Sequence, residues 1–163
     1  MSIQTQIGMP IDEFIRRYDE APFELIDGEV IPKMPTVSGH NRLSKRFFVA
    51  LLPFEQQGFG EVFQEATYVL ADSSQWVKNS RIPDVMFVSA AKLEQFKRDI
   101  PDAENKPYIL VPDIVIDIVS PTDQYSEISR RVKRYLSDGV PLILIVDPET
   151  RERGASVGER SAG

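Results

Sequence analysis

The sequence contains Val111-Pro-Asp-Ile-Val-Ile-Asp-Ile-Val-Ser-Pro121, an almost continuous run of Val and Ile bounded by prolines. Such a run predicts a central strand that is covered on both faces of a sheet. Asp117 lies in the middle of it, on the same side as Val115 and Val119 because strand residues alternate between faces. An ionised carboxylate buried there needs a metal, a cation or hydrogen bonds to offset its desolvation. We therefore expect a functional site at Asp117; the alternative is a strand-end Asp hydrogen-bonded to a neighbouring loop.

The composition is that of an ordinary soluble protein. With 163 residues, 42% of them hydrophobic and 27% charged, we expect one domain over residues 1–150. The tail, residues 151–163, is mostly Arg, Glu, Gly, Ser and Ala, and we expect it to be disordered. No apolar run is long enough to span a bilayer, and no leader opens the sequence, so a cytoplasmic location is the expectation.

Residue usage also limits the chemistry. There is no cysteine and only one histidine, His40, which excludes disulfides, thiolate sites and a zinc site with several imidazoles. A metal would sit on carboxylates and water, which suits Mg²⁺ or Mn²⁺. The net charge of −6 argues against bulk electrostatic binding of nucleic acid but leaves room for a local basic patch. Phosphate-loop, nucleophile-elbow and dinucleotide-binding motifs are missing from the sequence.

Hydrophobic periodicity and turn residues predict an α/β protein with a mixed sheet flanked by helices. An amphipathic helix over 10–19 and a hairpin over 23–31, turning on Asp27-Gly28, come first. Ser38 is a candidate N-cap for a helix that ends in the fifties. The remaining predictions are a strand over 61–70, a polar turn over 72–80, a strand over 82–88, a helix over 90–98, a loop over 99–107, a strand over 113–119, a helix over 124–138 and a strand over 140–146.

Three places carry the residue types that phosphodiester hydrolysis needs. They are Asp84 at the mouth of a strand, Asp117, and the cluster Arg130-Arg-Val-Lys-Arg134 in the next helix. Two acids on neighbouring strands can hold a divalent metal, and a nearby cation can hold a phosphate. Each also has a structural interpretation: Asp84 as a turn residue, the cluster as a solvated helix face that pairs with Glu127, and His40 as a structural histidine.

Five segments, in this order, resemble the Uma-two family of the restriction-endonuclease-like PD-(D/E)XK nuclease superfamily. They are Phe23-Glu-Leu-Ile-Asp-Gly-Glu29, Gly39-His40, Arg81-Ile-Pro-Asp-Val-Met-Phe-Val-Ser89, Val111 to Asp123, and Tyr135-Leu-Ser-Asp-Gly-Val-Pro141 with Ile145-Val-Asp-Pro148. The resemblance covers about residues 10 to 150. It implies the core order αβββαβ, preceded by an N-terminal helix and a β-hairpin.

The resemblance also implies roles for residues. Asp84 matches the acid of the "PD" motif and Asp117 the acid of "(D/E)XK", so both are expected to be catalytic and to bind the metal. The motif's lysine position falls on the apolar Val119; the family's basic residue then comes from the following helix, at Arg131, with Lys133 two residues on. Arginine stays protonated and does not replace lysine as a proton shuttle. His40 matches the family's histidine before the first core helix and is a further expected site residue. The family's hairpin acid corresponds to Glu24 or Glu29, and either could reach the metal.

Three functions remain open at this point. The first is an Mg²⁺- or Mn²⁺-dependent endonuclease acting on DNA. The second is a binding or interaction module that kept the fold and lost the chemistry, which the missing lysine, the acidic net charge and the short C-terminus favour. The third is a structural domain with a satisfied buried Asp. Because the chain ends soon after the Val-Asp-Pro turn, we expect an open sheet edge that a homodimer would cover.

Overall fold

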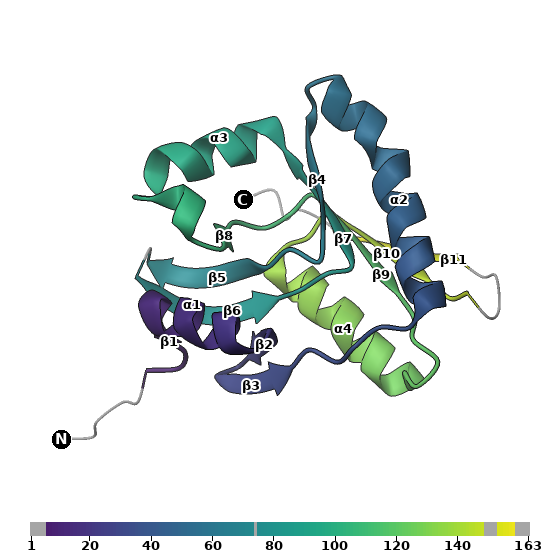
Figure 1. Ribbon diagram of the computed structural model, residues 1–163, viewed down its shortest axis with the longest axis horizontal. Helices are drawn as coiled ribbons and strands as arrows, with labels where there is room; N and C mark the ends of the chain where they lie inside the picture. The colour runs from purple at the N-terminus through teal and green to yellow at the C-terminus, as the bar shows by residue number, and fades with distance from the viewer. Residues whose placement is uncertain (1–5, 74, 149–152, 159–163) are drawn as a thin grey trace. The chain divides into compact units, whose positions relative to one another are not determined.

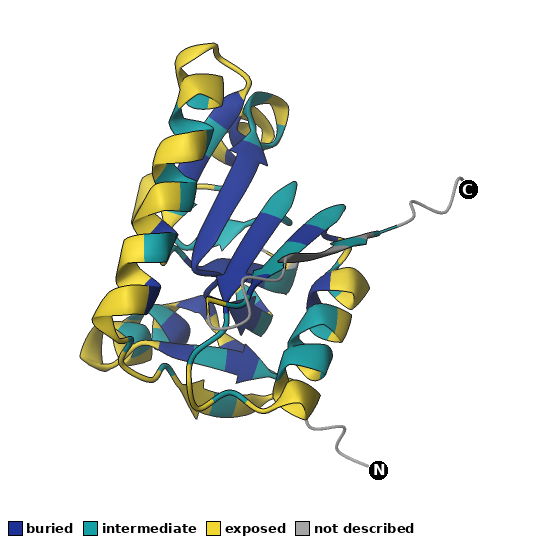
Figure 2. Ribbon diagram, turned by 90° about the vertical axis from the view of Figure 1, so that its right-hand side faces the viewer, coloured by how far each residue is buried: buried dark blue, intermediate teal, exposed yellow. Residues whose placement is uncertain are grey.

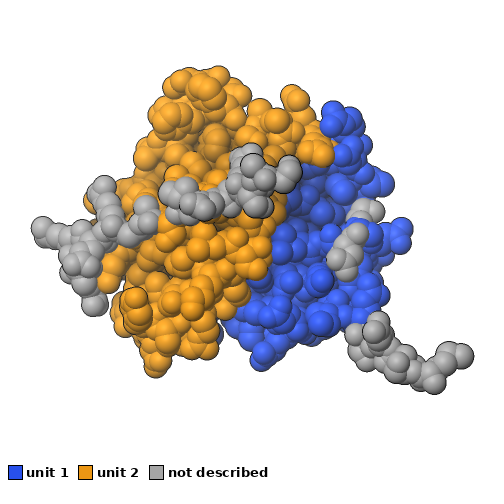
Figure 3. All heavy atoms as spheres, turned by 180° about the vertical axis from the view of Figure 1, so that it is seen from behind, with its two compact units in different colours: residues 1–34, 67–82, 96–110 blue, residues 35–66, 83–95, 111–163 orange. Residues whose placement is uncertain are grey.

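The computed structural model describes residues 6–73, 75–148 and 153–158. They form two compact units, each assembled from three segments of the chain (Figure 3). The first unit contains residues 1–34, 67–82 and 96–110; the second contains residues 35–66, 83–95 and 111–163. Whether residues 1–150 make a single domain stays a prediction. Within the described residues, no helix is long and apolar enough to cross a membrane.

The first unit is built around the predicted helix and hairpin. Asp27 and Gly28 have φ values of 49° and 87°, the left-handed pair that a two-residue hairpin turn requires. An apolar core joins the helix to the strands and includes Phe14, Leu25 and Val77. The sheet has the order β1-β6-β5-β8 and the hairpin is β2-β3. The elements are β1 (Met9–Pro10), α1 (Ile11–Glu20), β2 (Phe23–Ile26), β3 (Glu29–Pro32), β5 (Tyr68–Ser73), β6 (Trp76–Arg81), the 3-10 turn η1 (Ala103–Asn105) and β8 (Tyr108–Ile109).

The second unit contains the expected αβββαβ core, here α2-β4-β7-β9-α4-β10 (Figure 1). Its sheet has the order β11-β10-β9-β7-β4 and is mixed, since β10 runs parallel to β9 and the other pairs are antiparallel. The elements are α2 (Ser38–Gln56), β4 (Gly60–Gln64), β7 (Val85–Ser89), β9 (Ile114–Ile118), α4 (Tyr125–Asp138), β10 (Leu142–Val146) and β11 (Arg153–Val157). The boundary between the two units falls within the helix α3 (Ala90–Asp99), after residue 95.

The two faces of this sheet are covered by different helices. On β9, Ile116 and Ile118 join a buried apolar cluster against Leu43, Phe47 and other residues of α2. The intervening residues point to the opposite face, and Asp117 there bonds to side chains of α4. The central strands are buried while the outward sides of the helices are exposed (Figure 2). The prediction of a strand buried on both faces is confirmed.

Some local predictions are wrong. The expected single strand over 61–70 is two strands, β4 and β5, because Glu65 adopts a left-handed φ of 52° between them. The expected turn over 72–80 contains most of β6. Its Ser80 is buried, and the Ser80 hydroxyl accepts the Leu25 N–H at 2.8 Å, which satisfies a polar group there. Ser38 begins α2, and Val37 takes the N-cap position without a side-chain cap.

The tail also differs from its expectation. Residues Arg153–Val157 form β11, paired antiparallel with β10 from Leu142↔Val157 to Val146↔Arg153. Backbone groups along the edge of β10 pair with the backbone of another strand whatever the polarity of its side chains, which explains how a polar segment forms β11 there. Residues 159–163 lie outside the described residues. The open edge at β10 that suggested a homodimer is therefore covered, and the homodimer stays a prediction.

Candidate active site

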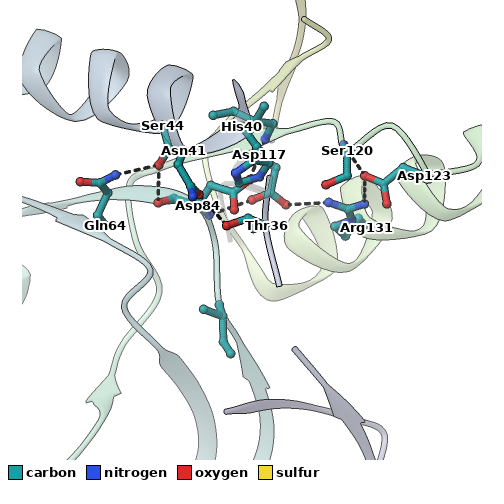
Figure 4. A network of polar contacts seen from close by, with 12 residues as sticks. Thr36, His40, Asn41, Ser44, Gln64, Asp84, Asp117, Ser120, Asp123 and Arg131 are labelled. Carbon is teal, nitrogen blue, oxygen red and sulfur yellow. Dashed lines mark hydrogen bonds and ion pairs between the residues drawn. The ribbon is translucent and has the colours of Figure 1, made fainter. Parts of the chain in front are cut away.

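Asp84 and Asp117 face each other across two neighbouring strands. The β7–β9 register pairs Val85 with Ile116, and continuing it by one residue places Asp84 opposite Asp117. Asp84 and Asp117 lie side by side (Figure 4), and the Asp84 N–H donates to Asp117 Oδ1 at 3.0 Å. The Ile118 N–H donates to Asp84 Oδ2 at 2.8 Å. Each residue is only 3% exposed. The sheet backbone itself therefore sets the spacing of the two carboxylates.

Helix α4 contacts Asp117 through two residues one turn apart. The Tyr135 hydroxyl donates to Asp117 Oδ2 at 2.8 Å, and Arg131 Nη1 lies 3.7 Å from the same oxygen. Arg131 Nη2 also pairs with Asp123 Oδ2 at 2.9 Å, and that oxygen accepts the Ser120 N–H at 2.9 Å (Figure 4). Residues at i and i+4 share one face of a helix, so Arg131 and Tyr135 reach the acid together.

Helix α2 contacts Asp84 in the same way. His40 Nε2 lies 3.0 Å from Asp84 Oδ2, and the Ser44 hydroxyl donates to the Asp84 carbonyl oxygen at 3.5 Å. The Gln64 amide donates to Ser44 Oγ at 3.0 Å (Figure 4). His40 and Ser44, again four residues apart, are 4% and 3% exposed. Both the side chain and the carbonyl of Asp84 are thus held by one helix face.

The electrostatics follow from this burial. Removal from water raises the pKa of Asp117 from 3.8 to about 6, and the charge of Asp84 adds to the rise. Arg131, the Asp84 N–H and the Tyr135 hydroxyl lower it in part. Burial alone would lower the pKa of Arg131, but Asp117 and Asp123 outweigh it, so the pKa of Arg131 lies above its usual value. Arg131 therefore keeps its charge beside the acids.

The pair Asp84 and Asp117 fits a hard divalent cation. Two like charges buried side by side, with the pKa of Asp117 raised to about 6, are the arrangement that a cation would stabilise. Among the described residues no cluster of three or more His, Cys, Asp or Glu suits a metal. Mg²⁺ commonly takes one or two carboxylates and completes its octahedron with water and phosphate oxygens. Asp84 and Asp117 match that number of carboxylates, and Mg²⁺ or Mn²⁺ at this site stays a prediction.

The other predicted residues lie elsewhere. Lys133 is exposed and about 200° around α4 from Arg131, at about 100° per residue. In the first unit, Glu24 Oε1 accepts the Ile82 N–H at 2.9 Å, and Glu29 is exposed on β3. Their approach to a metal stays a prediction.

Four residues of the candidate site were not predicted from the sequence: Asp123, Tyr135, Ser44 and Gln64. The four-residue spacing of Arg131 and Tyr135 in the helix after the Asp117 strand was the available signal for Tyr135. Ser44 has the same spacing from His40. For Gln64 and Asp123 the sequence offers no comparable signal, because their roles depend on how separate elements meet.

Comparison with known proteins identifies the family. The family model Uma2, described as "Putative restriction endonuclease", matches residues 11–153. A crystal structure of a "putative nuclease belonging to DUF820" from Anabaena variabilis superposes with a TM-score of 0.73 at 17% sequence identity, covering 94% of this chain and 82% of that one. The search of curated proteins found no match. The likeness confirms the restriction-endonuclease-like α/β fold. Since the family model spans most of its residues, the chain belongs to the Uma2 family.

Proposed function

We propose that the protein is a metal-dependent endonuclease that hydrolyses phosphodiester bonds in DNA. Asp84 and Asp117 hold one Mg²⁺ or Mn²⁺ ion, and Arg131 contacts the phosphate. The observation that carries the proposal is the buried acid pair, set opposite each other by the strand register, with Arg131 beside one of them. Membership of a nuclease family supports the reaction class.

The residues divide the work between them. A divalent ion held by the two acids would polarise the phosphate and lower the pKa of water. His40 and Ser44 orient Asp84, and Tyr135 orients Asp117, so the carboxylates lose little freedom on binding a cation. Arg131 stabilises negative charge that develops on the phosphate. It does not accept a proton, because a guanidinium stays protonated.

A plasmid-nicking assay tests the proposal. Wild-type protein should nick supercoiled DNA with Mg²⁺ or Mn²⁺ and stop when the metal is chelated. Asp84→Asn and Asp117→Asn should abolish nicking, while Asp19→Asn, the same change at an exposed position of α1, should not. Metal-independent nicking, or nicking that survives both active-site changes, would refute the proposal.

A second candidate is a binding module that has lost catalysis. It is favoured by the arginine in place of the motif's lysine, and by the protein partners that the acids already have in Asp84 N–H, Ile118 N–H and Tyr135. Calorimetric titration with Mg²⁺ and with duplex DNA separates the two candidates. If the protein is a binding module, it should bind DNA, give no heat on titration with metal and not nick plasmid. If it is an endonuclease, it should bind metal, and Asp117→Asn should remove that binding.

A further inference from the structure

The outward face of α2 carries three cations within five residues. Arg42, Lys45 and Arg46 are all exposed, and the whole helix is exposed on this side (Figure 2). The sequence has no Asp or Glu between Glu29 and Glu55. In a chain with a net charge of −6, this stretch of uncompensated positive charge is local and unusual.

Several surface cations among the described residues pair with acids, and these three do not. Elsewhere Arg17 pairs with Glu13 at 3.6 Å, Lys92 with Asp113 at 3.1 Å and Arg98 with Asp99 at 3.5 Å. In the part of the chain that the structure describes, no ion pair to Arg42, Lys45 or Arg46 is found. The usual structural explanation for a cationic helix face, pairing with neighbouring acids, therefore does not apply to them.

The same helix contacts Asp84, one of the two proposed metal ligands. His40 and Ser44 contact Asp84 from the buried side of α2. At about 100° per residue, Arg42, Lys45 and Arg46 lie about 140° to 240° around the helix from His40. The cationic face is thus rigidly tied to Asp84 and separated from it by the thickness of one helix, about 10–12 Å with side chains. Since phosphates on one strand are about 3.4 Å apart along the axis, that thickness corresponds to about three nucleotides.

We propose that the outward face of α2, formed by Arg42, Lys45 and Arg46, binds backbone phosphates of the nucleic-acid substrate that flank the scissile phosphate. This inference rests on the proposed function, because it takes the acid pair as the place of cleavage. The contacts are to phosphates, so they position the substrate without reading its bases. The acidic net charge of the protein is then no obstacle to binding, because attraction is concentrated at one face.

Salt dependence gives the expected size of the effect. Each phosphate neutralised on B-form DNA contributes about 0.9 to the slope of log affinity against log salt concentration. Three cations therefore account for about 2.7 of that slope. The loss should be the same for different DNA sequences, and it should vanish on an oligonucleotide too short to extend about three nucleotides beyond the cleaved bond.

Fluorescence anisotropy with a labelled duplex in EDTA measures binding without cleavage. The test variant combines Arg42→Gln, Lys45→Gln and Arg46→Gln. The control combines Arg16→Gln, Lys97→Gln and Arg98→Gln, which changes the net charge equally at exposed positions of α1 and α3. Urea unfolding of each variant checks that the fold is kept. We expect the salt slope to fall by about 2.7 in the test variant and to keep its wild-type value in the control.

Other outcomes overturn the inference in distinguishable ways. If test and control variants bind alike while the wild type nicks plasmid with Mg²⁺, the α2 face is not the substrate contact and the proposed function stands. If the wild type neither binds nor nicks DNA, both proposals fall. If the test variant keeps its DNA affinity but loses binding to vesicles of anionic lipid, the face serves a membrane and the inference is wrong.

Discussion

Replacing Asp117 by Asn should stabilise the fold at neutral pH even though it removes the proposed metal ligand. Asp117 is 3% exposed, and burial followed by the charge of Asp84 raises its pKa from 3.8 to about 6. Asparagine keeps the shape and retains an oxygen that can accept the Asp84 N–H, but it carries no charge to desolvate. The ionised acid therefore lowers the stability of the folded state, and removing its charge should raise that stability measurably.

The magnitude and its pH window follow from that pKa. The interval from 3.8 to 6, at about 1.36 kcal/mol per pH unit, amounts to about 3 kcal/mol. Below pH 3.8 the carboxyl is protonated in both the folded and the unfolded state and costs nothing. Between 3.8 and 6 it ionises first in the unfolded state, so wild-type stability falls as pH rises. Above 6 the cost is complete and constant, whereas the Asn variant never incurs it.

Urea unfolding of wild type and Asp117→Asn on both sides of this window measures the effect. The variant should gain about 3 kcal/mol relative to wild type from the acid side to the neutral side, with unchanged m-values. Asp19→Asn controls for the change in net charge. A difference between wild type and variant that stays the same at all pH values would refute the reasoning. Mg²⁺ at about 100 times its Kd should stabilise wild type by about 2.7 kcal/mol and leave the variant unchanged.

Three further predictions concern residues around the acids and in the sheet. Arg131→Gln should lower nicking about 10²- to 10³-fold because it removes charge stabilisation, while the exposed Lys133→Gln should leave the rate unchanged; equal losses would contradict the assignment. Tyr135→Phe should raise the pKa of Asp117 further, because it removes a hydrogen-bond donor that stabilises the ionised carboxylate. An unchanged pH profile of nicking would argue against this. Gly60→Ala should destabilise the fold by about 1–3 kcal/mol, because the new Cβ would lie 2.1 Å from the Val88 carbonyl oxygen; an unchanged urea midpoint would show that the strands give way.

The elements that the sequence predicted well are those whose signal is local. The Val/Ile run around Asp117, the glycine after α4 and the Asp27-Gly28 turn each specify a backbone conformation through neighbouring residues. The order αβββαβ follows once those elements are placed. The placing of Asp84 and Asp117 side by side was predictable for the same reason, since Asp84 directly precedes β7 and Asp117 lies within β9.

Elements with distant partners were missed. Most of β6 looked like a turn because its polar residues suggest exposure, yet Ser80 and Arg81 are buried against the backbone of Leu25, more than fifty residues away in the chain. The strand β11 likewise depends on pairing with the edge of β10. Residues 153–157 themselves give no sign of that edge. Polarity alone therefore mispredicts any strand whose polar groups are satisfied by another segment.

The two acids are held by independent means, which determines what substitutions can do. Their separation is set by strands β7 and β9, through the Asp84 N–H and the Ile118 N–H. Their orientation is set by the helices, with His40 and Ser44 of α2 on Asp84, and Arg131 and Tyr135 of α4 on Asp117. Arg131 and Tyr135 also lower the pKa of Asp117. A change on one helix should therefore alter the orientation of one acid, and a change on α4 also the ionisation of Asp117, while the spacing persists. In the proposed reaction, metal binding depends on the spacing and catalysis depends also on the charge. Helix substitutions should therefore affect turnover more than they affect the geometry of the proposed metal site.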